Sequence, residues 1–539
     1  MFIKKKKFKN KDGSERVYAQ VCKSKRVDGK PKTFVLYDLG RIDTPEGQKL
    51  FRDFSRCILN ASEELEFFDA KNHLRCDDTK EFGTHYVFKR LWKKLGFSEV
   101  ISKHLSKNNT DFDIAESVYN MVLNRLSSPT SKHALEDWQQ GIYGIKQFKP
   151  QHYYRAMDYL MEAKDEIELG CYEKIKDLFN LSVDVVLFDT TTLVYYGEGD
   201  KHEDLLARGF SKAKRSDLKQ IVVGVIMSKE GVPLGHEVFS GNTNDVSCFK
   251  QIIDKVSLKF NLGKLILVGD RGMISKKNIK HLDDKGYEYI LGYRMRTISK
   301  SERAKILEKS KLKVINKDKL HWREVSYDGS KLLVCYNPER AKLDQKKREE
   351  IIERIKEKIK YAGDVKVLIG NPDYKKFLKI TGKKPELDES RVESDALYDG
   401  VYVLTSNTKM NGHEIIDAYK SLWQIEAGFR ALKSELELGP IYHWKDRRIR
   451  AHVMICFLAL VLRTNLNKKL KEKYKDASYR KVLNDLRSLK AVNLEIKSVP
   501  ITVRTDCKEG AMQAIKALAM RSPPLTLSHS PISNLVALI

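Results

Sequence analysis

The stretch Asn411–Leu438, NGHEIIDAYKSLWQIEAGFRALKSELEL, decides how the rest of the chain is interpreted. Tyr419, Glu426 and Lys433 recur in it at intervals of seven residues. Seven residues make nearly two turns of α-helix, so these side chains drift by only about 20° per step and form one polar stripe. The same helix has an apolar face, formed by Ile415, Leu422, Ile425, Phe429 and Leu432. Because the apolar face serves packing, we expect the polar stripe to serve another role.

Two apolar runs upstream each end in an aspartate. Val185–Asp189 lies within VDVVLFD, and Leu265–Asp270 reads LILVGD. One aspartate after a strand is weak evidence for a site, because such residues often cap helices or form turns. Two of them together with a helix glutamate supply the oxygen ligands that a pair of divalent ions requires. We therefore expect Asp189, Asp270 and Glu426 to bind two Mg²⁺ or Mn²⁺ ions, with Asp189 bridging both.

Between residues 181 and 295 the sequence alternates strand patterns with helix patterns. The predicted order is strand 183–189, strand Gln220–Met227, strand Leu234–Phe239, helix 245–260, strand 264–270, helix 275–285 and strand Tyr289–Tyr293. This is the element order of an RNase H-like α/β core, in which the first and fourth strands lie side by side. Asp189 and Asp270 would then be neighbours.

The whole chain is predicted to be an α/β protein with its RNase H-like core interrupted by an insertion. Asp270 and Glu426 are 156 residues apart, which is far more than a strand–helix step needs. The predicted regions are a basic β unit (1–45), a helical DNA-binding region (46–180), the first part of the core (181–300), a β-containing insertion domain (301–400), the second part of the core with the glutamate helix (401–500) and a C-terminal tail (501–539).

The helical region contains a candidate DNA-reading motif. Asp111–Leu126 is amphipathic and stops at Ser127-Ser128-Pro129, and a new helix is predicted to begin under the cap of Thr130 or Ser131. This pattern fits a helix-turn-helix, but it also fits a simple helical hairpin, which is the commoner case. Further on, Arg447–Asn465 is predicted to be a buried helix, and the rest is predicted to be helical up to a Ser/Pro-rich tail.

The balance of charges points to a polyanionic partner. Lys+Arg 100 against Asp+Glu 73 gives a net charge of +27, and residues 1–33 hold twelve basic residues against three acidic ones. Lys and Arg gain affinity for DNA by releasing counterions from its phosphates. A generally basic proteome would explain the total, but it does not explain the clustering. We therefore expect double-stranded DNA as a partner.

The cysteines and the apolar runs indicate a soluble cytoplasmic protein. The eight cysteines are far apart in the sequence and show no zinc-site spacing, so we expect reduced thiols. The N-terminus MFIKKKKFKN lacks the apolar segment of a signal peptide. The longest apolar run, Val453–Leu462, has ten residues and is too short to span a bilayer. We expect no membrane partner.

Taken together, these residues resemble the DDE transposases of bacterial insertion sequences, in the branch with a Y-x2-R-x3-E-x6-K signature. The matching positions are Tyr419, Glu426 and Lys433. The signature arginine is replaced by Leu422, and Arg430 or Lys420 is a candidate for its phosphate contact. The contexts FDTTTL, VGDRGMIS and VFSGNTND also resemble this branch, as does the β-rich insertion before the glutamate.

The resemblance implies a complete reaction. The enzyme would bind the terminal inverted repeats of its element, cleave to expose a 3′-OH, and join that end to target DNA, acting as a homodimer in a paired-end complex. Two alternatives remain: an RNase H-like nuclease that only hydrolyses, and an inactive DNA-binding derivative.

Five residues are candidates for DNA contacts. Lys433 would hold a phosphate as a point charge, and Tyr419 would hydrogen-bond a phosphate or stack on a base. Arg271, beside the second aspartate, would contact a phosphate or pair with a carboxylate. Asn242, in a loop after the third strand, either contacts the substrate or belongs to a capped turn. Arg430 completes the set through the resemblance.

Overall fold

The computed structural model describes most of the chain, in nineteen ranges of residues. These are 2–10, 13–27, 30–55, 74–105, 108–179, 185–197, 204–212, 215, 217–260, 266–273, 275–295, 298–299, 302–303, 306–307, 313–315, 320–361, 371–381, 384–496 and 499–527. The chain forms two compact units. Unit 1 comprises Met1–Thr79, Ala491–Arg504 and Pro524–Ser530, and unit 2 comprises Lys80–Lys490, Thr505–Pro523 and Pro531–Ile539.

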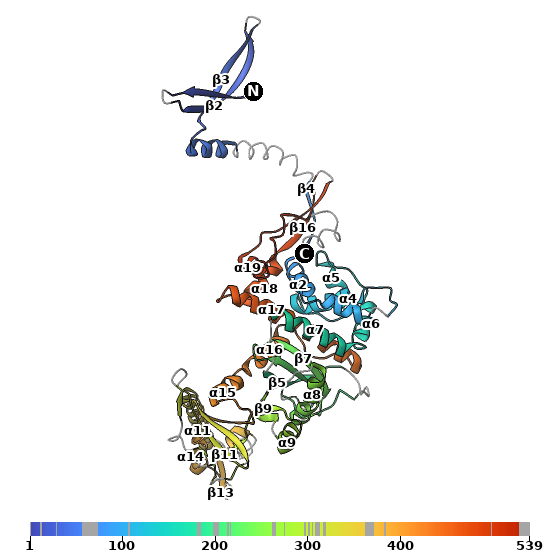
Figure 1. Ribbon diagram of the computed structural model, residues 1–539, viewed down its shortest axis with the longest axis vertical. Coiled ribbons are helices and arrows are strands. Elements are labelled where there is room, and N and C mark those ends of the chain that lie inside the picture. Colours follow the sequence, from blue (N-terminus) through green and yellow to red (C-terminus); the bar gives the residue numbers. More distant parts are fainter. Residues whose placement is uncertain are drawn as a thin grey trace. The chain divides into compact units, whose positions relative to one another are not determined.

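Unit 1 begins with a three-stranded antiparallel sheet in the order β1-β2-β3 (Figure 1). Its strands are β1 (Phe2–Lys9), β2 (Glu15–Val27) and β3 (Lys30–Arg41), and residues 45–55 are helical. Within the predicted basic β unit, the sequence patterns of Arg16–Lys23 and Thr33–Leu39 predict two strands, and these residues form parts of β2 and β3. β1 gives no such pattern, because its four consecutive lysines hide the alternation between apolar and polar side chains.

A second sheet, in the order β18-β17-β16-β4, corrects the prediction that the end of the chain is helical. Its strands are β4 (Leu74–Glu81), β16 (Lys490–Ile496), β17 (Val499–Arg504) and β18 (Thr526–Leu527). The strands form because AVNLEI and VPITVR alternate apolar with polar side chains and are rich in β-branched residues. Of the predicted tail, residues 528–539 lie outside the described residues.

Unit 2 is built around a nine-stranded sheet in the order β10-β11-β12-β15-β9-β8-β5-β6-β7. Five of its strands follow the predicted core, namely β5 (Val185–Val194), β6 (Gln220–Ser228), β7 (Pro233–Ser240), β8 (Ile266–Gly269) and β9 (Glu288–Gly292). β5 pairs antiparallel with β6 and parallel with β8. The first and fourth predicted strands are therefore neighbours, as expected.

The course of β5 corrects one expectation, because Asp189 does not end the strand. β5 continues through Val194, and Thr190, Thr191 and Thr192 pair with β6. β-Branched residues favour this extended conformation, so the TTTLV sequence prolongs the strand past the aspartate. What ends near Asp189 is the pairing with β8, whose last pair is Phe188 with Gly269.

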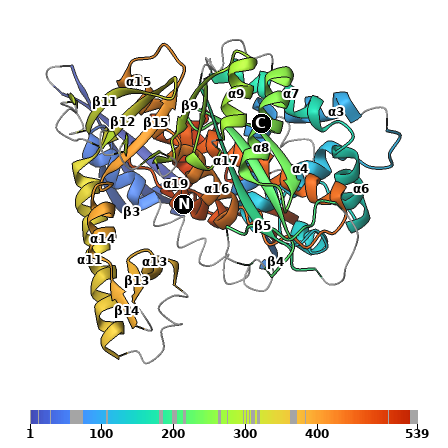
Figure 2. The ribbon, with the colours of Figure 1, turned by 90° about the horizontal axis from the view of Figure 1, so that it is seen from below.

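Helices cover both faces of the core strands (Figure 2). They are α8 (Asp245–Phe260), α9 (Lys276–Asp284), α16 (Trp423–Ser434) and α17 (Asp446–Lys473). Val186 and Phe188 join a core cluster with Phe249 of α8. On the opposite face, α16 packs against β5 and β6 so closely that a Cβ at Gly428 would meet Met227 Cε at 2.2 Å.

The region predicted as an insertion contributes strands to the same sheet. β15 (Val401–Ser406) pairs antiparallel with β9 and β12, so that the insertion strands extend the core sheet. The remaining elements are β10 (Lys313–Ile315), β11 (Leu320–Tyr327), β12 (Ser330–Tyr336), α11 (Pro338–Tyr361), α13 (Pro372–Lys375), β13 (Leu378–Thr381), β14 (Lys384–Leu387) and α14 (Glu389–Ala396). β13 and β14 form a separate hairpin.

The predicted glutamate helix is two helices, which corrects the expectation of one continuous stripe. α15 (Gly412–Lys420) starts under a capping box formed by Asn411 and Glu414. It is separated from α16 at Ser421, whose hydroxyl donates to Ala418 O at 2.5 Å. Local i to i−3 backbone bonds tighten this turn. The tighter turn changes the helical phase, so Tyr419 is not in strict seven-residue register with the residues of α16.

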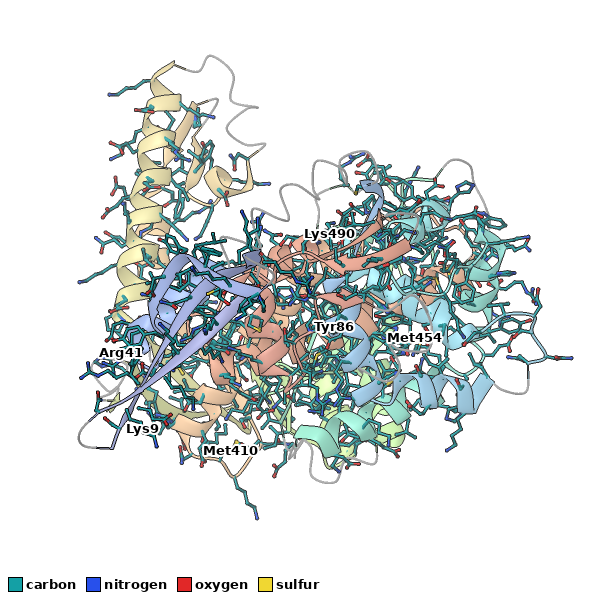
Figure 3. All side chains as sticks on the ribbon, turned by 90° about the horizontal axis from the view of Figure 1, so that it is seen from above. Lys9, Arg41, Tyr86, Met410, Met454 and Lys490 are labelled. Atoms are coloured by element: carbon teal, nitrogen blue, oxygen red, sulfur yellow. The ribbon has the colours of Figure 1, made fainter. Side chains whose placement is uncertain are left out.

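The predicted helical region is confirmed as mainly helical. It comprises α2 (Gly83–Lys94), α3 (Phe97–Leu105), α4 (Ile114–Ser127), α5 (Leu135–Gln140), α6 (Pro150–Leu160) and α7 (Lys164–Phe179). Later in the described part of the chain lie α18 (Tyr479–Ser488) and α19 (Glu509–Ala517). α5 begins later than predicted: Thr130 is bonded to the Asn124 side chain, and the Ser131 hydroxyl accepts from Ala134 N, ahead of the first helical residue Leu135. Tyr86 of α2 and Met454 of α17, both labelled in Figure 3, are buried.

The predicted buried helix is confirmed in α17, which includes the ten-residue apolar run. By length and apolar composition α17 could cross a membrane. However, 83% of its most apolar window is buried inside the protein, as in the core helix of a soluble protein.

Candidate active site

Asp189 and Asp270 are brought together by the register of two parallel strands. Each directly follows the last residue that pairs β5 with β8, because this pairing ends at Phe188 and Gly269. Successive side chains of a strand point to opposite faces, so Asp189 leaves β5 on the face opposite to Phe188. That face is the one on which α16 packs. The two aspartates therefore meet at one edge of the parallel pair.

Tyr419 at the end of α15 contacts the second aspartate. Its hydroxyl donates to Asp270 Oδ1 at 3.4 Å, and a Cβ at Gly292 would lie 2.6 Å from the same hydroxyl oxygen. Burial raises the pKa of Tyr419, and the negative charge of Asp270 raises it further. The phenol is therefore a neutral hydrogen-bond donor to Asp270 at physiological pH.

The environment of Asp189 opposes its negative charge. Burial raises the pKa of Asp189 from its ordinary value of 3.8 to about 6, against the opposing effects of Lys212 and of the Thr190 amide. Asp270 and Asp245 add to the increase by electrostatic repulsion. Carboxylates that repel one another in a partly buried place have the donor chemistry that suits a hard divalent cation. These carboxylates thus offer oxygen donors that suit a divalent metal ion.

Lys212 is a site residue outside the predicted candidates, and Asp245 belongs to the same VFSGNTND stretch as the candidate Asn242. Lys212 Nζ lies 3.9 Å from Asp189 Oδ1 and 3.5 Å from Asp245 Oδ2. Thr190 Oγ1 donates to Asp245 Oδ1 at 2.5 Å, which ties the start of α8 to β5. The VFSGNTND context contains Asp245 and could have drawn attention to it. Lys212 gives no comparable signal, because it is one of 100 basic residues.

Glu426 and Lys433 both lie on α16 and are exposed. Burial of the amine and the nearby Lys212 lower the pKa of Lys433, whereas Asp189 raises it. Lys433 is therefore close enough to Asp189 for their charges to interact. Within the described residues, no group of three or more His, Cys, Asp or Glu side chains is close enough to hold a metal ion. The structure thus joins Asp189, Asp270, Tyr419 and Lys433, but it does not bring Glu426 into a ligand group.

The other three candidate residues are exposed. Arg430 lies on α16, and Arg271 begins a short 3₁₀ turn directly after Asp270. The charge of Arg271 lowers the pKa of Tyr419, which places this side chain near the phenol. Asn242 follows β7. All three are accessible to a ligand in solution.

Comparison with known families identifies the class of protein. Residues 182–462, more than half of the chain, match the model of the transposase DDE domain. The chain therefore belongs to the DDE transposase family. Residues 3–61 match the N-terminal domain of IS1634 family transposases, so the protein is a transposase of a bacterial insertion sequence. The resemblance drawn from the sequence is confirmed at this level.

Comparisons with curated proteins and with solved structures add no functional assignment. No curated protein matches the chain. Among solved structures, the chain is similar to a cryo-EM structure of the piggyBac transposase synaptic complex with hairpin DNA, with 11% identity and a TM-score of 0.35, covering 75% of this chain and 78% of that one.

Proposed function

We propose that this transposase binds the terminal inverted repeats of its element, cleaves the DNA at those ends, and joins the exposed 3′-OH to target DNA. The observation that carries the proposal is the pairing of β5 with β8, which makes Asp189 and Asp270 neighbours. The membership of the DDE transposase family supports the class of reaction.

The core is proposed to be RNase H-like. In chain order its five strands are arranged 3-2-1-4-5, with the second strand antiparallel to its two neighbours and the other pairs parallel. This arrangement supports the proposal. The boundaries proposed for the regions are 1–45, 46–180, 181–300, 301–400, 401–500 and 501–539, with 301–400 as the insertion.

Asp189, Asp270 and Glu426 are the proposed ligands of two Mg²⁺ or Mn²⁺ ions. When bound, two such ions would activate an oxygen nucleophile and stabilise the leaving oxygen of a phosphodiester. Asp189 is the proposed bridging ligand. Tyr419 orients Asp270 through its hydrogen bond, so that a lone pair of the carboxylate remains directed to the ligand side. For Glu426, a rotation of its exposed side chain or closure of α16 on DNA would complete the set.

Four of the five candidate residues are proposed to contact DNA. Lys433 and Arg430 on α16, Arg271 after β8 and Asn242 after β7 are exposed and lie on elements of the core. Cationic side chains at these places would hold phosphates on either side of the scissile bond. A direct phosphate contact by Tyr419 would require the phenol to give up its bond to Asp270, so we assign Tyr419 mainly to that carboxylate.

The proposed partners are the inverted-repeat DNA, the target DNA and a second copy of the chain. A homodimer would hold two element ends in one complex. The chain is proposed to act in the cytoplasm of its host cell, where its DNA substrate is accessible.

One experiment separates the proposed reaction from its alternatives. Purified protein is incubated with labelled inverted-repeat DNA, a target plasmid and Mg²⁺. Joined products support transposition. Cleavage without joining would favour a nuclease that only hydrolyses, and binding without cleavage would favour an inactive DNA-binding derivative.

A further inference from the structure

The backbone around Lys212 is fixed to the core sheet. Gln220 at the start of β6 exchanges two backbone hydrogen bonds with Ala207, at 3.0 and 3.3 Å, and its side-chain amide donates to Phe210 O at 3.1 Å. Lys212 N donates to Thr192 Oγ1 on β5 at 3.0 Å. These bonds anchor the segment at both of its neighbouring strands. The position of the Lys212 side chain is therefore set by the fold.

The ammonium group of Lys212 is tied to the residue next to Asp189. Lys212 Nζ donates to Thr190 O at 2.8 Å and to Thr190 Oγ1 at 2.9 Å. An ammonium group has three N–H donors. Besides its two bonds to Thr190, Lys212 Nζ lies 3.5 Å from Asp245 Oδ2 and 3.9 Å from Asp189 Oδ1. The side chain of Lys212 is 33% exposed, and that of Asp189 is 25% exposed. The positive charge thus lies beside Asp189 in a partly desolvated place.

We propose that Lys212 is a positioning residue that serves as the resident counter-cation of Asp189 and competes with the divalent ion for this carboxylate. The inference rests on the proposed function, because it requires Asp189 to be a metal ligand. A fixed positive charge about 4 Å from a carboxylate repels a second cation that approaches the same oxygen atoms. In the metal-free protein, the same charge offsets the repulsion that Asp189 experiences from Asp245 and Asp270.

Metal binding in this scheme leaves Lys212 in place but changes its partners. The hydrogen bonds to Thr190 and the ion pair with Asp245 do not involve Asp189, so they persist when Asp189 turns to the metal. Removal of the positive charge should therefore tighten metal binding, and it should also leave the metal-free protein less stable. A side chain with a purely structural role would produce the second effect without the first.

The experiment is a titration of the full-length protein with Mn²⁺ in the absence of DNA, in which free Mn²⁺ is measured by electron paramagnetic resonance. Lys212→Met is expected to lower the Kd for Mn²⁺ on the order of tenfold, and Lys212→Arg, which keeps the charge, is expected to bind like the wild type. The matched control is Lys481→Met on α18, which removes an equal charge from an exposed ion pair with Glu509. The control should leave the Kd unchanged.

The outcomes distinguish this inference from the proposed function. If Asp189→Asn binds Mn²⁺ as well as the wild type, the metal site itself is wrong. If Asp189→Asn loses Mn²⁺ but Lys212→Met binds with unchanged or weaker affinity, only the role of Lys212 is overturned. Tight binding by Lys212→Arg would also contradict it. Should Lys212→Met not fold without metal, Lys212→Gln is measured instead, with the increase of Tm on addition of Mn²⁺ as readout; an increase no larger than in the wild type overturns the inference.

Discussion

The Asp189 carboxyl lies where burial and two neighbouring carboxylates oppose its charge and where Lys212 supports it. Asp270 has a different environment, because it is exposed and accepts a hydrogen bond from a half-buried phenol. The two aspartates are therefore unequal in spite of their equivalent places on adjacent strands. Because this environment disfavours the charged carboxylate, Asp189 lowers the free energy of unfolding at neutral pH. A carboxylate held in such an unfavourable place is typical of a ligand site.

The first prediction concerns the pH dependence of stability. The raised pKa of Asp189 means that the folded protein retains a proton that the unfolded chain has lost between pH 3.8 and about 6, so stability falls as pH rises through that window. Asp189→Asn removes this loss. The difference in unfolding free energy between the variant and the wild type, measured by urea in EDTA, should grow by about 3 kcal/mol across the window and then stay level. A difference that does not change with pH would contradict the assignment.

The second prediction concerns Lys433 as a phosphate contact. Lys433→Ala should weaken binding to inverted-repeat DNA and reduce the slope of log affinity against log salt by about one, because one fewer counterion is released. Fluorescence anisotropy at several salt concentrations measures both quantities. Lys481→Ala serves as the control for the loss of one charge. An unchanged slope for Lys433→Ala would exclude a phosphate contact by this residue.

At the scale of elements, the site depends on how α16 packs against the sheet. α16 carries Glu426 and Lys433, and it approaches β6 closely at Gly428. The break at Ser421 separates this helix from α15, which positions Tyr419 over β8 and β9. The two helices thus supply different parts of the site. Tyr419 belongs to the Asp270 side, and Lys433 belongs to the Asp189 side.

The third prediction tests this packing. A Cβ at Gly428 would meet the end of the flexible Met227 side chain at 2.2 Å, which a shift of that methionine can relieve for alanine but not for a branched residue. Gly428→Val should lower the unfolding free energy by about 2 kcal/mol and reduce cleavage, whereas Gly428→Ala should be close to the wild type. Ala427→Val on the same helix is the control. Equal stability of Gly428→Val and Ala427→Val would contradict close packing at Gly428.

Sequence periodicity predicted the core strands well, because each is a short apolar run bounded by turn residues. It could not show that β5 continues past Asp189, since a threonine run fits a loop as well as a strand. The break at Ser421 was hidden because the apolar spacing of the flanking helices is almost continuous. Lys212 was missed because its contacts with Thr190 span 22 positions and follow from the fold rather than from any motif.

At the scale of the whole molecule, a chain with a large positive net charge contains a cluster of carboxylates at its site. The net charge of +27 favours binding to DNA at any sequence, whereas the repulsion among Asp189, Asp245 and Asp270 would oppose the approach of a phosphate. A divalent cation resolves this conflict, because it supplies positive charge at the carboxylates. Binding and cleavage should therefore separate in acid variants: the DNA remains bound through the basic surface while the chemistry stops.

The most direct test of the proposed site is the joining of inverted-repeat DNA to a target plasmid by Glu426→Ala, measured beside DNA affinity. Glu426 is the most informative residue for this test, because it is the proposed metal ligand that the structure does not group with the aspartates. We predict that Asp189→Ala, Asp270→Ala and Glu426→Ala each bind DNA like the wild type and give no cleaved or joined product, whereas the exposed-acid control Glu509→Ala is active. Normal cleavage by Glu426→Ala would contradict the three-carboxylate site.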